Sequence, residues 1–97
     1  MTKLAMLVNI EAKSGKEREV EALLLGALPL AQAEAGTRGW HAFRSGPSTF
    51  GIFETFDDEG GRHAHAEGRI ARLLLDHSEE LLARPPQMVS VDVLAAK

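Results

Sequence analysis

The segment from Phe50 to His65, FGIFETFDDEGGRHAH, decides the fold because it joins an apolar strand to a short helix through a run of acidic residues. Alternate residues of a strand share one face, so Phe50, Ile52, Glu54 and Phe56 point the same way. The Glu54 carboxylate therefore lies among apolar neighbours, where it needs hydrogen bonds or a cation to remain ionised. Two interpretations are open: Glu54 and His65 form a polar pair inside a ligand cavity, or Glu54 is a structural acceptor for backbone amides or an arginine.

The composition is that of a small globular domain. The chain has 97 residues, of which 44% are hydrophobic and 26% are charged, and we predict a single domain over residues 1–97. At this size the buried core is marginal, so self-association would help stability. The net charge of -3 offers no basic surface to attract phosphates, and we therefore expect no nucleic-acid binding.

The absence of cysteine limits both chemistry and location. Without cysteine there are no disulfides, no thiolate nucleophile and no cysteine-ligated metal, which suits a cytoplasmic protein. No apolar run approaches the roughly 20 residues that cross a bilayer, and the chain begins directly with a strand-like segment. We therefore expect a cytoplasmic protein with no signal peptide and no membrane contact.

Apolar periodicity predicts the other elements. A strand is expected at 4–10 with both faces largely apolar and with Asn9 as its one uncharged polar side chain. The spacing of Ser14 and Glu17 is that of a capping box, and it predicts a helix that ends near Gly36 in the left-handed conformation. Further elements are expected as strands at 39–45 and 87–94, a short helix capped by Asp57 or Asp58, and a longer helix at 69–83.

The order of these elements predicts the fold class. Strand, helix, strand, strand, helix, strand (βαββαβ) is the ferredoxin-like split βαβ arrangement, an α+β fold with one four-stranded antiparallel sheet and helices on one face. The other face of the sheet is also apolar and has no helix left to cover it. We therefore predict a homodimer that pairs the two exposed faces.

Three stretches carry a family resemblance that extends over nearly the whole chain. The first strand runs into KSGKE at 13–17, EAGTRGW at 34–40 has the pattern acid-x-Gly-x-x-Gly-aromatic, and FETFDD at 53–58 is followed by His65. In these stretches the chain resembles the antibiotic biosynthesis monooxygenase domain family. The resemblance implies a dimeric α+β barrel, in a family of cofactor-independent quinone-forming oxygenases, haem-degrading enzymes and members without assigned activity.

The chain departs from the family pattern at positions that bear on activity. The tryptophan that usually closes the third strand is Phe56 here, so any role of an indole at that point is lost. The axial histidine of haem-degrading members would fall near Leu74, and their haem-distorting tryptophan near His65. We therefore do not expect haem degradation, and we predict no cofactor and no metal.

Oxygenation without flavin or metal needs few protein groups. An electron-rich phenol, quinol or anthrone loses a proton, and its anion passes an electron to oxygen inside a water-poor pocket. Phenols have pKa values of about 10, so a positioned base and a donor for the developing charge supply most of the help. His65 or His41 is the candidate base, and Asn9 or Arg44 is the candidate oxyanion donor.

These considerations define a candidate site and a function. The predicted catalytic residues are Glu54, His65 and Asn9, and the predicted substrate-binding residues are Trp40, Arg44, Phe50 and Phe56. The predicted function is oxidation of a small electron-rich aromatic by molecular oxygen. The alternatives are a non-catalytic dimer that binds or senses a small molecule, and a structural dimer in which Glu54 and His65 only stabilise the fold. Trp40 is either a cavity wall or a core residue, and whether the chain is an enzyme stays open at this point.

Overall fold

The structure is a computed structural model that describes residues 4–66 and 68–97. The predicted βαββαβ order is present, with one short extra helix before the second long helix. The elements are β1 (Leu4–Glu11), α1 (Glu17–Gln32), β2 (Thr37–Arg44), β3 (Thr49–Phe56), α2 (Glu59–Ala66), α3 (Arg69–Leu81) and β4 (Gln87–Asp92). The ferredoxin-like α+β fold class is therefore confirmed.

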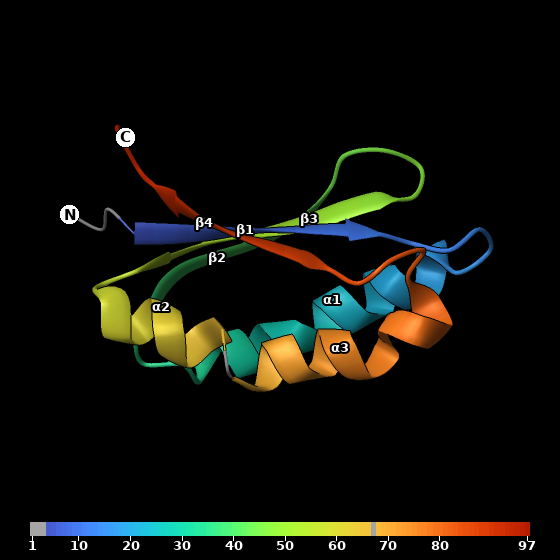
Figure 1. Ribbon diagram of the computed structural model, residues 1–97, viewed down its shortest axis with the longest axis horizontal. Helices are drawn as coiled ribbons and strands as arrows, with labels where there is room; N and C mark the ends of the chain where they lie inside the picture. The colour runs from blue at the N-terminus through green and yellow to red at the C-terminus, as the bar shows by residue number, and fades with distance from the viewer. Residues whose placement is uncertain (1–3, 67) are drawn as a thin grey trace.

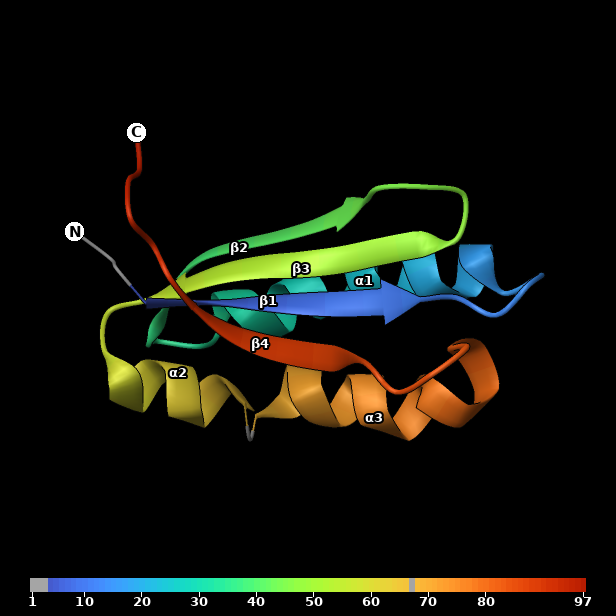
Figure 2. The same cartoon turned by 45° about the horizontal axis from the view of Figure 1, so that its top comes forward.

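The sheet has four antiparallel strands in the order β2-β3-β1-β4. The three helices lie against one of its faces and leave the other bare (Figure 1; Figure 2). The register places Glu54 of β3 between Met6 of β1 and Trp40 of β2, so these three side chains share a face. That face is covered by the helices, because Met6 and Glu54 are both buried.

The hydrophobic core lies between the covered face of the sheet and the helices. Alternate residues of β1 and β3 supply its upper layer, and the apolar stripes of α1 and α3 supply its lower layer. Full burial of one such side chain contributes about 1.5–3 kcal/mol. The main contributors are Met6, Val8, Ile10, Phe50, Ile52, Phe56, Val20, Leu24, Ile70 and Leu74.

The bare face of the sheet is apolar in its middle. Leu7, Phe53, His41 and Val89 form one row across the four strands. Val89 is 45% exposed, although it is a large apolar side chain. A patch of this kind is typical of a surface that contacts another protein.

The predicted ends of the first helix are wrong. α1 begins at Glu17 with Lys16 as its N-cap and without a side-chain cap, so the expected capping box of Ser14 is not formed. Gly15 turns the chain just before the helix with a φ of 87°, and no other described residue has a positive φ. The predicted left-handed glycine at Gly36 is therefore absent, and α1 already ends at Gln32.

The last helix and the last strand are each two residues shorter than predicted. α3 ends at Leu81 because Leu82 is extended, with φ -107° and ψ 142°, and forms an isolated bridge with Ala12. The bridge ties the end of the helix to the end of β1. β4 ends at Asp92, not at Leu94.

Candidate functional site

Glu54 and His65 lie against each other under the covered face of the sheet. Glu54 comes from β3 and is fully buried, and His65 comes from α2 and is 4% exposed. The Nε2 atom of His65 is 2.8 Å from Oε1 of Glu54. The two residues that the sequence analysis paired are therefore in contact.

A third residue, Glu34, contacts the other side of the histidine, so that Glu54, His65 and Glu34 form a row. Oε1 of Glu34, in the connection between α1 and β2, is 2.6 Å from Nδ1 of His65. The same oxygen accepts a hydrogen bond of 2.8 Å from the Thr37 hydroxyl. His65 thus lies between two carboxylates, one on each ring nitrogen.

The two carboxylates differ in their place in the fold and in their exposure to solvent. Glu54 is fixed on a central strand, whereas the Glu34 side chain is 21% exposed and belongs to a connection between elements. Neither oxygen of Glu54 has a well-aligned hydrogen bond within the described segments, and the indole Nε1 of Trp40 is buried without a partner there. The contact with His65 is therefore what compensates the buried charge of Glu54.

The two carboxylates also set the proton affinity of His65. Burial by itself lowers the pKa of an imidazole because water no longer stabilises the charged ring. Here the hydrogen bonds and charges of Glu54 and Glu34 outweigh burial, so that the pKa of His65 is raised above its ordinary 6.5. Glu54 and Glu34 thus favour the protonated form of the ring.

Two glycines let α2 approach the connection that carries Glu34. A Cβ atom built on Gly61 would lie 2.8 Å from the carbonyl oxygen of Gly36, which is closer than real side chains come. Asp58 caps the helix, since its Oδ1 accepts a 2.9 Å hydrogen bond from the Gly61 amide. Gly61 therefore allows the close approach that brings His65 to Glu34.

A hollow opens next to the exposed end of this row. Its volume is about 390 Å³, and its walls include Glu34, Thr37, Gly61, His65 and Arg69. This volume is within the range of about 300–1,000 Å³ that is common for small-molecule sites. A ligand in the hollow would reach Glu34 and His65, while Glu54 lies behind the histidine.

The other predicted site residues do not gather at this hollow. Asn9 is exposed and pairs with Gly51 and Gln87 on the bare face of the sheet, opposite to Glu54 and His65. Arg44 lies at the far end of the β2–β3 hairpin, where its Nε donates to the Gly46 carbonyl at 3.0 Å. In this chain, therefore, neither Asn9 nor Arg44 is placed to act as an oxyanion donor beside His65.

The predicted aromatic walls are likewise distributed over separate places. Phe50 stacks under Arg44, whose Cζ atom is 5.2 Å from the ring centre, and both line a small hollow at the hairpin end. Phe56 is fully buried, with its ring centre 5.4 Å from that of His65. Trp40 lines a hollow between α1 and β2. Of the predicted substrate-binding residues, Phe56 lies against the His65 ring, and Trp40 is the neighbour of Glu54 across β2 and β3.

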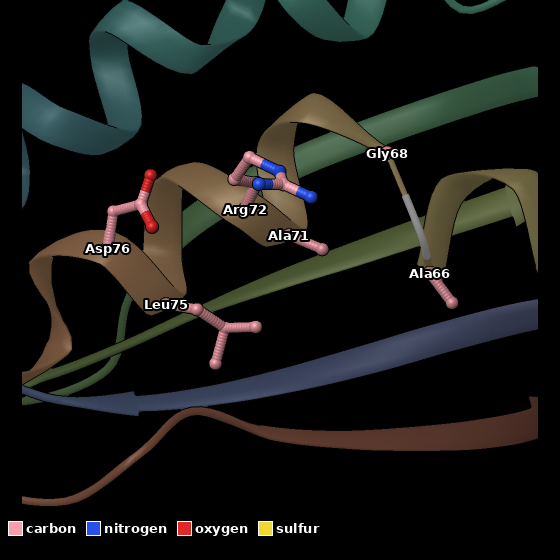
Figure 3. Close-up of a pocket in the computed structure, with 6 residues that line it drawn as sticks. All are labelled: Ala66, Gly68, Ala71, Arg72, Leu75 and Asp76. Atoms are coloured by element: carbon pink, nitrogen blue, oxygen red, sulfur yellow. The ribbon is translucent and has the colours of Figure 1, made fainter.

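A larger hollow, of about 610 Å³, lies along α3 beyond the end of α2. Its lining consists of Ala66, Gly68, Ala71, Arg72, Leu75 and Asp76, and includes none of the predicted site residues (Figure 3). In this view Arg72 and Asp76 project to one side of α3, and Ala71 and Leu75 to the other. Among its described lining residues, Arg72 and Asp76 are charged and none is a histidine.

The row of Glu54, His65 and Glu34 is not arranged as a metal site. The carboxylates contact opposite ring nitrogens and so do not converge on one point, as ligands of a single ion must. In the described part of the chain, no group of three His, Cys, Asp or Glu side chains is placed to hold a metal ion. What the row can do is hold and move a proton between the core and the hollow.

The site and fold define a ferredoxin-like α+β protein with an acid–histidine–acid row under its sheet. Among solved structures, the chain is 52% identical to the Nitrosomonas europaea protein NE2512, of unknown function, with a TM-score of 0.96 and coverage of 100% of this chain and 94% of that one. The chain therefore belongs to the same family as NE2512. No protein-family model and no curated protein matches it.

More distant structures have the same fold. A second Nitrosomonas europaea protein, provisionally described as an antibiotic biosynthesis monooxygenase, is 18% identical with a TM-score of 0.82, and covers 95% of this chain and 99% of that one. A Bordetella bronchiseptica protein with the same provisional description is 18% identical with a TM-score of 0.79, and covers 98% and 100%. The fold of this chain is thus that of the antibiotic biosynthesis monooxygenase-like proteins, as the resemblance implied.

Glu34 is the site residue that the sequence analysis missed. It appeared there only as the acid of the pattern at 34–40, and it is separated from His65 by 31 residues. The signal that could have found it is that pattern: an acid before two glycines, in a connection that must pass close to a neighbouring helix.

Proposed function

We propose that this protein is a cofactor-independent monooxygenase-like enzyme that oxidises a small electron-rich aromatic, such as a phenol, quinol or anthrone, with molecular oxygen. The observation that carries the proposal is the orientation of His65. Its Nε2 faces the buried Glu54, and its Nδ1 faces Glu34, which lines the hollow of about 390 Å³ together with His65. When Glu34 leaves Nδ1, the neutral imidazole is a base with a carboxylate behind it and a pocket in front, which is the usual arrangement for proton abstraction.

The roles of the residues follow from this geometry. Once Glu34 has left Nδ1, the neutral form of the imidazole takes the proton of the substrate hydroxyl at that atom, and Glu54 stabilises the imidazolium that results. The substrate anion then gives up electrons to oxygen. Overall, a ring CH₂ or the CH of a phenol becomes a carbonyl, one oxygen atom enters the product, and the other leaves as water with the two hydrogens removed. The substrate supplies all four electrons, so the reaction balances without a further reductant.

Oxygen consumption tests this function directly. Metal-stripped protein is assayed with a panel of quinols, anthrones and polyphenols, next to His65→Ala and Glu54→Gln. Since a general base contributes about 10²–10⁴-fold, His65→Ala should lose at least about 100-fold in turnover. His63→Ala is the matched control, because His63 is exposed and precedes His65 by two residues in α2. A loss of no more than two-fold in folded His65→Ala would defeat the assignment.

The alternative is a small-molecule-binding or sensing protein with no turnover. One observation favours it: both ring nitrogens of His65 already contact a carboxylate, so no base is free in this state. Saturable binding of an aromatic ligand without oxygen consumption across the panel would support this function over the enzymatic one.

We also propose that the protein is a cytoplasmic homodimer with its partner on the bare face of the sheet. An apolar surface is present there, formed by Leu7, Phe53 and Val89 next to His41. Helices cover only the opposite face (Figure 1). Pairing two such faces would remove both patches from water. In the described segments, no helix is long and apolar enough to cross a membrane.

A further inference from the structure

The Glu34 carboxylate occupies a position that is built to hold a negatively charged oxygen. Its Oε1 atom receives two donors, the Nδ1–H of His65 at 2.6 Å and the Thr37 hydroxyl at 2.8 Å. Both donors belong to the walls of the same hollow, and Arg69 on another wall adds positive charge. The donors are fixed on α2 and β2, whereas Glu34 belongs to the connection and is partly exposed.

We propose that Glu34 acts as an internal stand-in for the ligand, and that the ionised hydroxyl of an acidic phenol or enol displaces it and accepts hydrogen bonds from His65 and Thr37. This inference rests on the proposed function for its ligand class. It makes Glu34 a residue that determines specificity, and Thr37 a second donor to the ligand oxygen.

Charge balance selects the ligand. Glu54, His65 and Glu34 together carry one positive and two negative charges when the histidine is protonated. A singly charged oxygen that replaces Glu34 preserves this balance, whereas a neutral ether or hydrocarbon leaves the imidazolium donor without an acceptor, which is costly in a buried setting. The small walls at Ala35, Gly61 and Ala64 leave room beside this oxygen for an aromatic ring.

The test uses a pair of probes that differ only in the ionisable group. 4-Nitrophenol absorbs at different wavelengths as the neutral phenol and as the anion, and its methyl ether, 4-nitroanisole, cannot ionise. Binding of each is titrated without oxygen to wild type, Glu34→Gln and Glu34→Ala. An internal competitor leaves the site free for only a fraction of the time, and the apparent Kd is the intrinsic Kd divided by that fraction. Glu34→Ala should therefore bind the nitrophenolate about ten-fold more tightly than wild type.

The other variants give the order of effects. Glu34→Gln should lie between wild type and Glu34→Ala, since the glutamine carbonyl can still accept from His65 but carries no charge. Adding Thr37→Val to Glu34→Ala should weaken nitrophenolate binding by at least about ten-fold, because one hydrogen bond to a charged oxygen is lost. Binding of 4-nitroanisole should change less than two-fold in all of them, and the bound nitrophenol should absorb as the anion.

Two results would overturn the inference. One is nitrophenolate binding that is no tighter in folded Glu34→Ala and Glu34→Gln than in wild type. The other is an equal gain for 4-nitroanisole, which would mean that the shorter side chain only enlarges the hollow. Neither result depends on turnover. If the protein consumes oxygen but the variants do not show the expected order of nitrophenolate affinities, only the stand-in role of Glu34 is contradicted. If the variants show that order but no oxygen is consumed, only the proposed enzymatic function is contradicted.

Discussion

Replacement of His65 by alanine should destabilise the fold strongly, because it leaves Glu54 buried without a positive charge. Glu54 is fully buried, and in the described part of the chain its one ion pair is the 2.8 Å contact with Nε2 of His65. On the same face Met6 has no donor, and the indole N–H of Trp40 makes no hydrogen bond to Glu54. The alanine variant must therefore either keep an unpaired charge in the core or bind a proton there.

Proton uptake sets the magnitude of the loss. A glutamate in an unfolded chain has a pKa of about 4.3, so holding the proton at pH 7 costs about 3.7 kcal/mol at about 1.36 kcal/mol per pH unit. This agrees with the roughly 3–5 kcal/mol that is lost when one partner of a buried ion pair is removed. At pH 5 the same cost falls to about 1 kcal/mol. The destabilisation should thus shrink markedly as the pH is lowered.

Urea unfolding at pH 7 and pH 5 measures both quantities. The double variant Glu54→Gln/His65→Ala is the control, because glutamine has nearly the same size and no charge to bury. It should recover about 1–3 kcal/mol of the loss at pH 7, which is the coupling energy expected of contacting residues. A loss below about 1 kcal/mol in His65→Ala at pH 7, or one that is equally large at pH 5, would refute the charge-pair reasoning.

Four other outcomes are expected. His65 holds its proton more tightly in the folded chain, so its contribution to stability is complete below pH 6.5 and is lost as the pH rises through its raised pKa; urea midpoints of the wild type should fall over that interval. Gly61→Ala should cost about 1–3 kcal/mol in urea unfolding, because its Cβ would meet a carbonyl at 2.8 Å. Gly26→Ala, in a helix with nothing within 4 Å of the new Cβ, should stabilise by about 0.5–1 kcal/mol. Val89→Glu should reduce the sedimentation mass from dimer to monomer, whereas Leu25→Glu, 72% exposed on the helix layer, should not; a monomeric wild type would contradict the proposed dimer.

Sequence patterns predicted the elements better than their ends. The alternation in β3 placed Glu54 on the buried face, and the two-residue period of a strand is enough for that. The chain around α1 follows other features instead: a positive φ at Gly15 makes the turn before the helix, and after the helix Gly36 approaches Gly61 of a distant helix. The capping pattern of Ser14 and Glu17 carries no information about either feature.

The residues of the candidate site were likewise predicted only in part from the sequence. The sequence pairs Glu54 with His65 because an isolated carboxylate and a nearby histidine are chemically complementary, and the structure places them in contact. Asn9 was grouped with them by chemistry alone, and the register of β1 against β3 puts it on the other face. Glu34 could not be found by either route, because its contact with His65 depends on how closely α2 passes the connection at 33–36.

The burial of Glu54 bears on the choice between a structural and a functional row. Replacing a buried ion pair with apolar residues of similar size is often neutral or stabilising, so a purely structural role is poorly served by a carboxylate in the core. A row of this kind is useful where a proton must be held at a defined atom next to a cavity. Here the fixed carboxylate is behind the histidine, and the exchangeable one is in front, beside the hollow. That asymmetry favours a site that exchanges Glu34 for a ligand over one that only stabilises the fold.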